Sequence, residues 1–466
     1  MTVPGWVQDS VFYQIFPDRF ENGDKTNDPP NVQPWDSAPT TNGFQGGDLR
    51  GVIERLYYLL DLGVDTIYLN PIFLSPSNHR YNATDYFQID PKLGTLSDFH
   101  TLLDVAHRNR MRLILDGVFN HCGRGFFAFS DLLENQSASP YKDWFYIKRF
   151  PVDAYSPGDA TSYLAWWKFK SLPKLNTGNP LVRQYILSVT RFWTEQGIDG
   201  WRLDVPNEID DDPFWAAFRD TVKRINPDAY LVGEIWDGDK RWVGDAHFDG
   251  LMNYPLRVLI LDLLSGKITP EYFSSHLNQH HQQYAVENRN AMYNLLGSHD
   301  TERLLTMTGG SVQKAKLAYL MLMTQPGAPA VYYGDEVGIS GGKDPDCRKT
   351  FPWNESQWNN DLRRWVQTLI RIRKSQVALR RGEINVNTTH IGEGWVSWLR
   401  AYEDQECTVV INPSPSIKHA ATAVRKPGIY RNLLTSEEFT PIDTTVQLDL
   451  APWSGCILIP KSMPNE

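Results

Sequence analysis

Short apolar runs with strand character alternate with segments of helical periodicity from near the first residue to about residue 380. This alternation is typical of βαβ units, in which a helix returns the chain to the start of a parallel neighbouring strand. The runs begin at Val11, Asp65, Arg112, Gly200, Tyr230, Phe248, Met292 and Ala330. Because eight parallel strands close into a barrel, the pattern predicts an α/β fold with a (β/α)8 TIM barrel.

Two of the segments between these runs are well-marked helices. LVRQYILSVTRFWTEQG, from Leu181, carries apolar residues at helical spacing and stops at Gly197. DPFWAAFRDTVKRI, from Asp212, has Pro213 in its first turn and acids near its start, where the helix dipole favours them. We expect both to belong to the outer ring of helices.

Two stretches of the sequence do not follow the alternation of strands and helices. Residues 121–180 are rich in Tyr, Trp, Ser and Pro and too long for an ordinary βα loop, so we expect an inserted domain after strand three that walls the active site. After about residue 380, short alternating β runs predict a small antiparallel β domain. The expected division is a first barrel part at 1–120, the insertion at 121–180, the rest of the barrel at 181–380 and a C-terminal β-sandwich at 381–466.

The composition narrows the class of partner. A net charge of −9, without any run of Lys and Arg, argues against a nucleic-acid ligand. No stretch approaches the roughly 18 consecutive apolar residues that span a bilayer, and the first residues lack the pattern of a secretory leader. Cys122, Cys347, Cys407 and Cys456 form no CxxC pair, which argues against a zinc site or a disulfide framework. We therefore expect a cytoplasmic protein with neither nucleic acid nor membrane as a partner.

Three carboxylates end apolar runs: Asp204 in IDGWRLDV, Glu234 in YLVGEIW and Asp300 in NLLGSHD. The carboxyl ends of the strands are where a parallel barrel keeps its catalytic groups. An acid behind an apolar strand is costly to bury unless it is paired or used. Three such acids at the ends of three strands, roughly 30 and then 60-odd residues apart, predict an enzyme with its catalytic groups at one mouth of the barrel.

Four segments carry a family resemblance. DGVFNH at 116–121, GWRLDV at 200–205, GEIW at 233–236 and GSHD at 297–300 resemble, in this order, the signature regions of the α-amylase family of glycoside hydrolases. LPKLN at 172–176 and the opening FYQIFPDRFENGDKTND are similar to the neopullulanase, cyclomaltodextrinase and maltogenic amylase subgroup. The resemblance implies retaining hydrolysis of α-1,4 or α-1,6 bonds, or both, in maltooligosaccharides, pullulan and branched α-glucans.

The resemblance also assigns the catalytic roles. Retention requires one carboxylate to attack the anomeric carbon and a second, protonated, to release the leaving oxygen, about 5 to 5.5 Å apart. Asp204 is then the nucleophile, Glu234 the acid/base and Asp300 a third acid that stabilises the transition state. Arg202 lies two residues before Asp204, so both side chains share one face of a strand and its charge favours the ionised aspartate. Taken singly, the Asp204–Arg202 pair also suits a buried ion pair, and Glu234 a capping group.

The resemblance assigns substrate binding to Tyr81, His121, Arg202, His299, Arg303, Asn207, Glu208 and Trp236. The tyrosine would stack beneath the sugar at the cleavage point, the histidines would bond its hydroxyls and Arg303 would orient it. Alone, either histidine is more often a structural residue. The last three line the leaving-group side of the cleft, although Asn207 and Glu208 equally suit a helix start. Pro206 is a rigid residue at this turn that would reshape acceptor-side specificity.

The resemblance implies a structural calcium ion as the cofactor, whereas the local sequence alone favours a turn cluster. The loop ENGDKTND and the turn QGGDL supply several oxygen donors, the type that calcium favours: Asn22, Asp24, Asn27, Asp28, Gly46 and Asp48. The alternative is an Asn/Asp turn cluster that makes local backbone bonds. In the family, the counterparts of Asp116 and Asn120 brace the barrel mouth, that of Asn120 often near calcium, so we interpret both as structural.

The resemblance leaves three points open. Relatives in the subgroup usually carry an amino-terminal β-sandwich and often dimerise through it, whereas the first strand here begins at Val11. A homodimer is therefore an open expectation, cyclodextrin preference is not carried over, and debranching at α-1,6 bonds is a serious possibility. A glucanotransferase would use the same covalent intermediate. A non-catalytic glucan-binding barrel is less favoured, because all three acids are present.

Overall fold

The computed structural model describes residues 3–387 and 393–461, and its centre is a sheet of eight parallel strands in the order β8-β7-β6-β5-β2-β1-β10-β9. A parallel bridge between Met252 and Tyr293 joins the two end strands and closes the barrel. The barrel strands are β1 (Phe12–Ile15), β2 (Thr66–Leu69), β5 (Arg112–Gly117), β6 (Gly200–Leu203), β7 (Tyr230–Gly233), β8 (Gly250–Leu251), β9 (Tyr293–Asn294) and β10 (Ala328–Tyr332). Each of the eight predicted runs contains or overlaps one of these strands, so the predicted barrel is confirmed.

Successive side chains of a strand point to opposite faces, and this alternation separates two cores. Phe12, Tyr68, Ile114 and Tyr230 pack together inside the barrel. Their chain neighbours, such as Leu231, join the larger core between the strands and the surrounding helices. The alternation continues past the strand ends. A residue two or four positions after an inward-facing strand residue therefore also faces inward, and its side chain reaches the mouth of the barrel.

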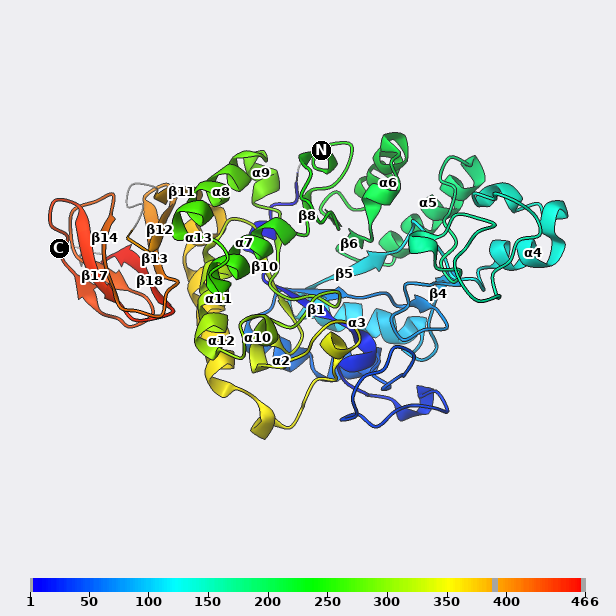
Figure 1. Cartoon of the computed structure of the whole chain (residues 1–466), viewed down its shortest axis with the longest axis horizontal. Helices are drawn as coiled ribbons and strands as arrows, with labels where there is room; N and C mark the ends of the chain where they lie inside the picture. The colour runs from blue at the N-terminus through cyan, green and yellow to red at the C-terminus, as the bar shows by residue number, and fades with distance from the viewer. Residues whose placement is uncertain (1–2, 388–392, 462–466) are drawn as a thin grey trace.

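Helices surround the barrel (Figure 1). They are α1 (Leu49–Glu54), α2 (Leu56–Leu62), α3 (Leu96–Arg108), α5 (Pro180–Glu195), α6 (Asp212–Ile225), α7 (Tyr254–Ser265), α8 (Pro270–Gln282), α9 (Val286–Arg289), α10 (Leu304–Met307), α11 (Val312–Thr324), α12 (Asn360–Ser375) and α13 (Val377–Arg381). The two predicted helices correspond to α5 and α6. The side chain of Asn179 caps the start of α5 and that of Asp211 caps α6, each followed within two residues by a proline in the first turn.

The insertion after β5 contains one α-helix, α4 (Phe127–Asn135), three short 3-10 helices, and turns joined by isolated bridges. Its small core is aromatic, with the ring of Phe129 lying 4.9 Å from that of Phe145 and 5.1 Å from that of Tyr163. A hairpin of β3 (Phe73–Leu74) and β4 (Asp85–Ile89) precedes it. In Figure 1 this end of the molecule lies opposite the C-terminal domain.

The C-terminal domain is antiparallel, as its pattern predicts. One sheet has the order β11-β12-β13-β18-β15-β16 and the other pairs β14 with β17. The strands are β11 (Glu383–Asn387), β12 (Val396–Tyr402), β13 (Gln405–Asn412), β14 (Lys418–Ala423), β15 (Tyr430–Asn432), β16 (Glu438–Phe439), β17 (Thr445–Leu450) and β18 (Ser454–Pro460). Val410, Ala420 and Val446 belong to the apolar cluster between the sheets.

The helices and the cysteines of the described residues have two further properties. Within 3–387 and 393–461, the helices lack the length and apolar content that crossing a bilayer requires. Each of the four cysteines is buried as a free thiol.

Candidate active site

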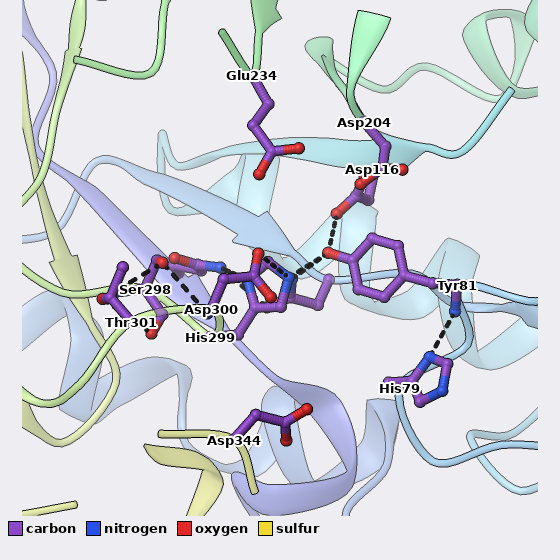
Figure 2. Close-up of polar contacts among 12 residues, drawn as sticks. His79, Tyr81, Asp116, Asp204, Glu234, Ser298, His299, Asp300, Thr301 and Asp344 are labelled. Carbon is purple, nitrogen blue, oxygen red and sulfur yellow. Dashed lines mark hydrogen bonds and ion pairs between the residues drawn. The ribbon is translucent and has the colours of Figure 1, made fainter. Parts of the chain in front are cut away.

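The mouth of the barrel gathers three carboxylates around the guanidinium of Arg202. Its Nη1 lies 2.8 Å from Asp204 Oδ1 and 2.8 Å from Asp116 Oδ1, and its Nη2 lies 2.8 Å from Glu234 Oε2. The four residues come from the ends of β5, β6 and β7, which are neighbours in the sheet, and all have inward parity. Figure 2 shows Asp204 and Glu234 pointing into the same space. Arg202 therefore holds both predicted catalytic acids close enough together to act on the same glycosidic bond of a substrate.

The contacts of these carboxylates differ in kind. Nη1 of Arg202 donates hydrogen bonds to Asp204 and Asp116. The Nη2 contact with Glu234 is an ion pair without hydrogen-bond geometry, and Nη2 has no other hydrogen-bond partner in the described chain. Glu234 instead accepts from the backbone N–H of Val205 at 3.1 Å and from the indole N–H of Trp236 at 3.2 Å. The predicted acid/base, Glu234, is thus held in place by Val205 and Trp236, whereas Arg202 donates its hydrogen bonds to the two aspartates.

The residue after the nucleophile has a strained backbone. Val205 adopts φ 34° and ψ 52°, a left-handed conformation that β-branched residues rarely adopt and that a following proline disfavours further. This conformation accompanies the hydrogen bond from its N–H to Glu234. Such strain persists only where surrounding structure enforces it, and it concentrates at functional sites.

Burial and charge set the protonation of the three acids. Burial raises the pKa of Glu234 to about 7, against the lowering effect of Arg202, and the charge of Asp300 adds to the rise. Burial also raises the pKa of Asp204, and Arg202 is the main opposing influence. One guanidinium cannot neutralise three adjacent carboxylates, so the group holds a proton at neutral pH. We assign that proton to Glu234, because it lacks a hydrogen bond from Arg202.

A second cluster forms around Tyr81 and His299. Their rings stack with centroids 5.2 Å apart and an interplanar angle of 2°. The Tyr81 hydroxyl donates to Asp116 Oδ2 at 2.8 Å and lies 2.5 Å from His299 Nε2. Gln14 donates its amide to His299 Nδ1 at 2.9 Å, which leaves the ring proton on Nε2. Burial lowers the pKa of His299 well below its usual value, so the ring is neutral and directs an N–H into the site.

Asp300 lies at the open side of this cluster. Its Oδ2 is 3.0 Å from His299 Nε2, and its Oδ1 is 3.2 Å from Arg348 Nη2. Arg348 also donates to the carbonyl oxygen of His299 and pairs with Asp344, which lies below Asp300 in Figure 2. The side chain of Asp300 is 31% exposed, against 9% for Asp204 and 3% for Glu234. It is therefore the most accessible of the three predicted catalytic acids.

Arg303 departs from its predicted role. Its side chain is fully buried, and its guanidinium donates to the carbonyl oxygens of Tyr333 and Cys347 and pairs with Asp335 at 3.1 Å. Arg303 therefore binds the chain segment that precedes Arg348, and its guanidinium is not directed at a sugar. The structure gives no support for the direct sugar contact that the family resemblance implies for Arg303, because its buried guanidinium is already bound by this segment.

His121 faces the site from the start of the insertion. Its ring stacks on Trp166 with centroids 5.5 Å apart, and burial lowers its pKa to about 3. Nε2 is buried and has no hydrogen-bond partner among the described residues. Asn120 contacts Nδ1 and accepts a bond from Lys174. A neutral imidazole with a free ring nitrogen suits a sugar hydroxyl.

The predicted leaving-group side is formed by a short turn. Residues 206–208 are a 3-10 helix with Asn207 and Glu208 exposed, so the predicted helix start is a single turn. Lys174 of LPKLN donates to the carbonyl oxygen of Glu208. Trp236 is 49% exposed and stacks on Tyr254 with centroids 3.8 Å apart.

Five of the six predicted calcium ligands lie together. Asp48 accepts from the N–H groups of Gly23, Asp24 and Gly51 and from the amide of Asn27, so it caps α1 and closes the loop. Asn22 donates to Asp28, and an added Cβ on Gly46 would lie 2.4 Å from Asp28 Oδ1. The sixth, Asp24, turns away to Thr26 and Arg50. Oδ1 of Asn22 and Oδ1 of Asn27 are buried without a hydrogen-bond partner in the described segments.

Four polar groups that complete the site were not predicted from the sequence: Gln14, Asn70, Asp344 and Arg348. Asn70 donates to the Tyr81 hydroxyl at 3.0 Å, and Gln14 donates to Asn70 as well as to His299. Gln14 lies within a predicted strand and Asn70 at the end of one, so strand parity could have identified both. Arg348 lies in an irregular segment whose position depends on tertiary contacts.

Comparison with known proteins places this geometry in context. The family description "Alpha amylase, catalytic domain" matches residues 14–379. Neopullulanase 2 of Thermoactinomyces vulgaris is 44% identical over 98% of this chain and 78% of that protein. The solved cyclic α-maltosyl-(1→6)-maltose hydrolase of Arthrobacter globiformis superposes with a TM-score of 0.91 at 40% identity, covering 98% of this chain and all of that chain. The Nostoc punctiforme debranching enzyme superposes with a TM-score of 0.88 at 39% identity, covering 98% and 99%.

Proposed function

Because this chain belongs to the α-amylase family, whose catalytic-domain description spans residues 14–379, we propose a retaining mechanism carried by Asp204 and Glu234. The chain is a glycosidase that hydrolyses α-glucosidic bonds. The observation that carries the mechanism is the contact of both acids with one guanidinium, that of Arg202. It supports one ionised and one protonated carboxyl side by side, which retention requires.

In the first step, the carboxylate of Asp204 attacks the anomeric carbon while Glu234 gives its proton to the glycosidic oxygen. The C–O bond to the leaving sugar breaks, and a glucosyl ester forms on Asp204. In the second step, the ionised Glu234 takes a proton from water, which attacks the same carbon and releases the sugar with its configuration retained. Asp300 and the neutral His299 would bind hydroxyls of this sugar. An acceptor sugar in place of water would give transfer.

For the bond, we propose cleavage of α-1,6 linkages in addition to α-1,4 linkages. The support is that two solved structures matched over nearly their whole length are a cyclic α-maltosyl-(1→6)-maltose hydrolase and a debranching enzyme. Neopullulanase 2 supports a pullulan-type substrate. Pullulan digestion tests this: maltotriose as a product reports α-1,6 cutting, and panose or maltose units report α-1,4 cutting. Panose or maltose without any maltotriose would show α-1,4 cutting alone and would contradict the proposal.

We further propose a structural calcium ion at the loop of residues 22–28. The unpartnered buried oxygens of Asn22 and Asn27, beside the carboxylates of Asp28 and Asp48, fit a cation that prefers oxygen. The ion would join this loop to the backbone at Gly46 and would take no part in bond cleavage. Asp24 is left out of the donor set, because Thr26 and Arg50 occupy its carboxylate.

A cytoplasmic location is also proposed. Its support is the intracellular maltogenic amylase of Bacillus subtilis (strain 168), which is 38% identical over 94% of this chain. A homodimer stays a prediction that sedimentation velocity would test.

A further inference from the structure

Five polar side chains form a hydrogen-bonded relay at the mouth of the barrel. The relay leads from Asp116 of β5 through the Tyr81 hydroxyl and Asn70, which follows β2, to Gln14 of β1 and the ring of His299. Gln14, Asn70, Asp116 and His299 are each 1% exposed. Because these side chains are buried, each group depends on its neighbour in the relay, and the direction of one hydrogen bond fixes the direction of the next.

The charge of Asp116 sets the direction of the relay. The Asp116 carboxylate accepts from Arg202 Nη1 and is ionised, so it has no proton to donate. The Tyr81 hydroxyl, 2.8 Å from Asp116 Oδ2, therefore donates its single proton there (Figure 2). Since that proton is used, the hydroxyl oxygen accepts from Asn70 Nδ2, 3.0 Å away. The amide of Asn70 is thereby held with its Oδ1 on the side of Gln14.

Gln14 passes this direction on to the histidine. Its Nε2 donates one proton to Asn70 Oδ1 at 3.1 Å and the other to His299 Nδ1 at 2.9 Å. The opposite orientation of the Gln14 amide would place Oε1 against Asn70 Oδ1, two acceptors without a proton between them. The His299 ring is neutral, because burial lowers its pKa well below the usual value, so its one proton lies on Nε2. Nε2 is the nitrogen that lies 3.0 Å from Asp300 Oδ2.

This orientation of Gln14 leaves one of its own atoms unsatisfied. Gln14 Oε1 is buried and has no hydrogen-bond partner in the described part of the chain. A buried carbonyl without a partner is unfavourable, whereas an apolar side chain of similar size would avoid that loss. The amide is therefore kept at a loss of stability, which is typical of a residue that has a role in the site.

We propose that Gln14 is a positioning residue for the hydrolysis, which holds His299 with its proton on Nε2. Asp116 sets this direction through Tyr81 and Asn70. The inference rests on the proposed hydrolysis of α-glucans. The Nε2–H group is then a fixed donor to a hydroxyl oxygen of the reacting sugar, and such hydrogen bonds strengthen in the transition state. A proton on Nδ1 would instead turn a lone pair of the ring toward the sugar.

The test locates the proton of His299 by nitrogen NMR of the substrate-free, full-length protein with isotope-labelled histidine rings. The signals of His299 are identified by their loss in His299→Gln. Gln14→Glu is the main variant, because a carboxylate only accepts and draws a proton onto Nδ1. Tyr81→Phe keeps the aromatic ring but removes the hydroxyl that orients Asn70.

Kinetics and a matched control accompany the spectra. Gln325→Glu is the control, because Gln325 is also fully buried and bonds a buried histidine, His281 at 2.9 Å, but lies before the start of β10. Gln14→Met removes the amide without adding a charge. For each variant, kcat and KM are measured with p-nitrophenyl α-maltoside, the aryl maltoside.

We expect the His299 proton on Nε2 alone in the wild type and in Gln325→Glu, on Nδ1 in Gln14→Glu, and on either nitrogen in Tyr81→Phe and Gln14→Met. Gln14→Glu should lower kcat about 10²-fold with KM within about threefold of wild type, because the lost bond is one that strengthens in the transition state. Gln14→Met should lower kcat about tenfold, and Gln325→Glu should stay within about twofold of wild type.

A wild-type His299 with its proton on Nδ1 would overturn the proposal. A proton that stays on Nε2 alone in Gln14→Glu or in Tyr81→Phe would also overturn it, as would equal kcat values for Gln14→Glu and Gln325→Glu. If Gln14→Glu does not fold, Gln14→Met decides, and unchanged His299 signals with unchanged kcat would overturn the proposal. A wild type that does not cleave the aryl maltoside would refute the proposed function instead, while the spectra would still locate the proton.

Discussion

Arg202 is the residue on which the chemistry of this site converges. Its guanidinium is fully buried and contacts Asp116, Asp204 and Glu234 at 2.8 Å each. Asp116 in turn accepts from Tyr68 and Tyr81, so it is the best-satisfied anion of the group. Asp116 therefore acts as a counter-ion that holds Arg202 in position, which leaves Asp204 free to attack.

Replacing Arg202 with lysine should lower kcat/KM for maltotriose about 10²-fold or more, because an ammonium cannot hold two carboxylates in a fixed fork. Arg202 lowers the pKa of Asp204 by favouring its charged form. Its loss should therefore move the acidic limb of the kcat/KM profile to higher pH. An unchanged acidic limb, in a variant with wild-type melting temperature, would show that Arg202 does not control the ionisation of the nucleophile.

The alkaline limb of the same profile should report Glu234, whose burial places its pKa at about 7. Above this pH the acid loses its proton, so kcat/KM should fall. Trp236→Phe removes an N–H that donates to the ionised carboxylate. Since that bond favours the charged form, the variant should shift the alkaline limb to higher pH. A shift to lower pH would contradict the assigned role of the indole.

Most of the catalytic centre could be predicted from single residues. Asp204, Glu234, Asp300, Tyr81 and His299 meet at the mouth of the barrel, because strand ends and motif order fix where they lie. The contacts of Arg348 and the burial of Arg303 could not be predicted. Both depend on the irregular segment 333–348, whose course no local periodicity determines.

At the scale of elements, the loop of residues 22–28 is the part whose stability should depend on a ligand. Calcium at a hundredfold excess over its dissociation constant would stabilise the protein by about 2.7 kcal/mol, which corresponds to a melting temperature about 3 °C higher for a chain of this length. Chelation by EDTA should reverse this, as differential scanning calorimetry would record. Asn27→Ala should abolish the response, while Asp24→Ala should preserve it. Equal melting temperatures with calcium and with EDTA would refute the site.

Buried Arg400 joins helix α11 to the C-terminal domain, and buried Arg373 of the barrel bonds the same helix end. Arg400 of β12 donates to Thr324 O at the end of α11 and to Gly382 O, and Arg373 of α12 donates to Met323 O. Cations at a helix C-terminus satisfy carbonyl groups that lack partners within the helix. This contact fixes the domain against the barrel.

Arg400→Met should lower the free energy of unfolding by about 2 to 4 kcal/mol, because two buried carbonyls lose their donor. Thermal melting would measure this. The kcat/KM for the aryl maltoside should remain within twofold of wild type, since Arg400 lies in the C-terminal domain. A variant as stable as the wild type would show that water satisfies these carbonyls.

For the whole molecule, the architecture was predictable in the regions where apolar residues recur at the regular spacing of a strand or a helix. Eight parallel strands and the antiparallel C-terminal sheets follow from regular apolar patterns. The interior of the insertion was not predictable in the same way, because isolated bridges such as His121 with Lys174 join residues far apart in sequence. The aromatic content of residues 121–180 predicted an inserted domain, but the stacking of Trp166 on His121 could be found only in the structure.

The central claim is that Asp204 forms a covalent bond to the sugar. The most direct measurement uses Glu234→Gln with α-maltosyl fluoride, whose fluoride leaves without an acid while the missing base slows hydrolysis of the ester. Intact-mass spectrometry should show a gain of one maltosyl unit, and peptide mapping should place it on Asp204. No adduct, or an adduct on Asp300 or Asp116, would contradict the account.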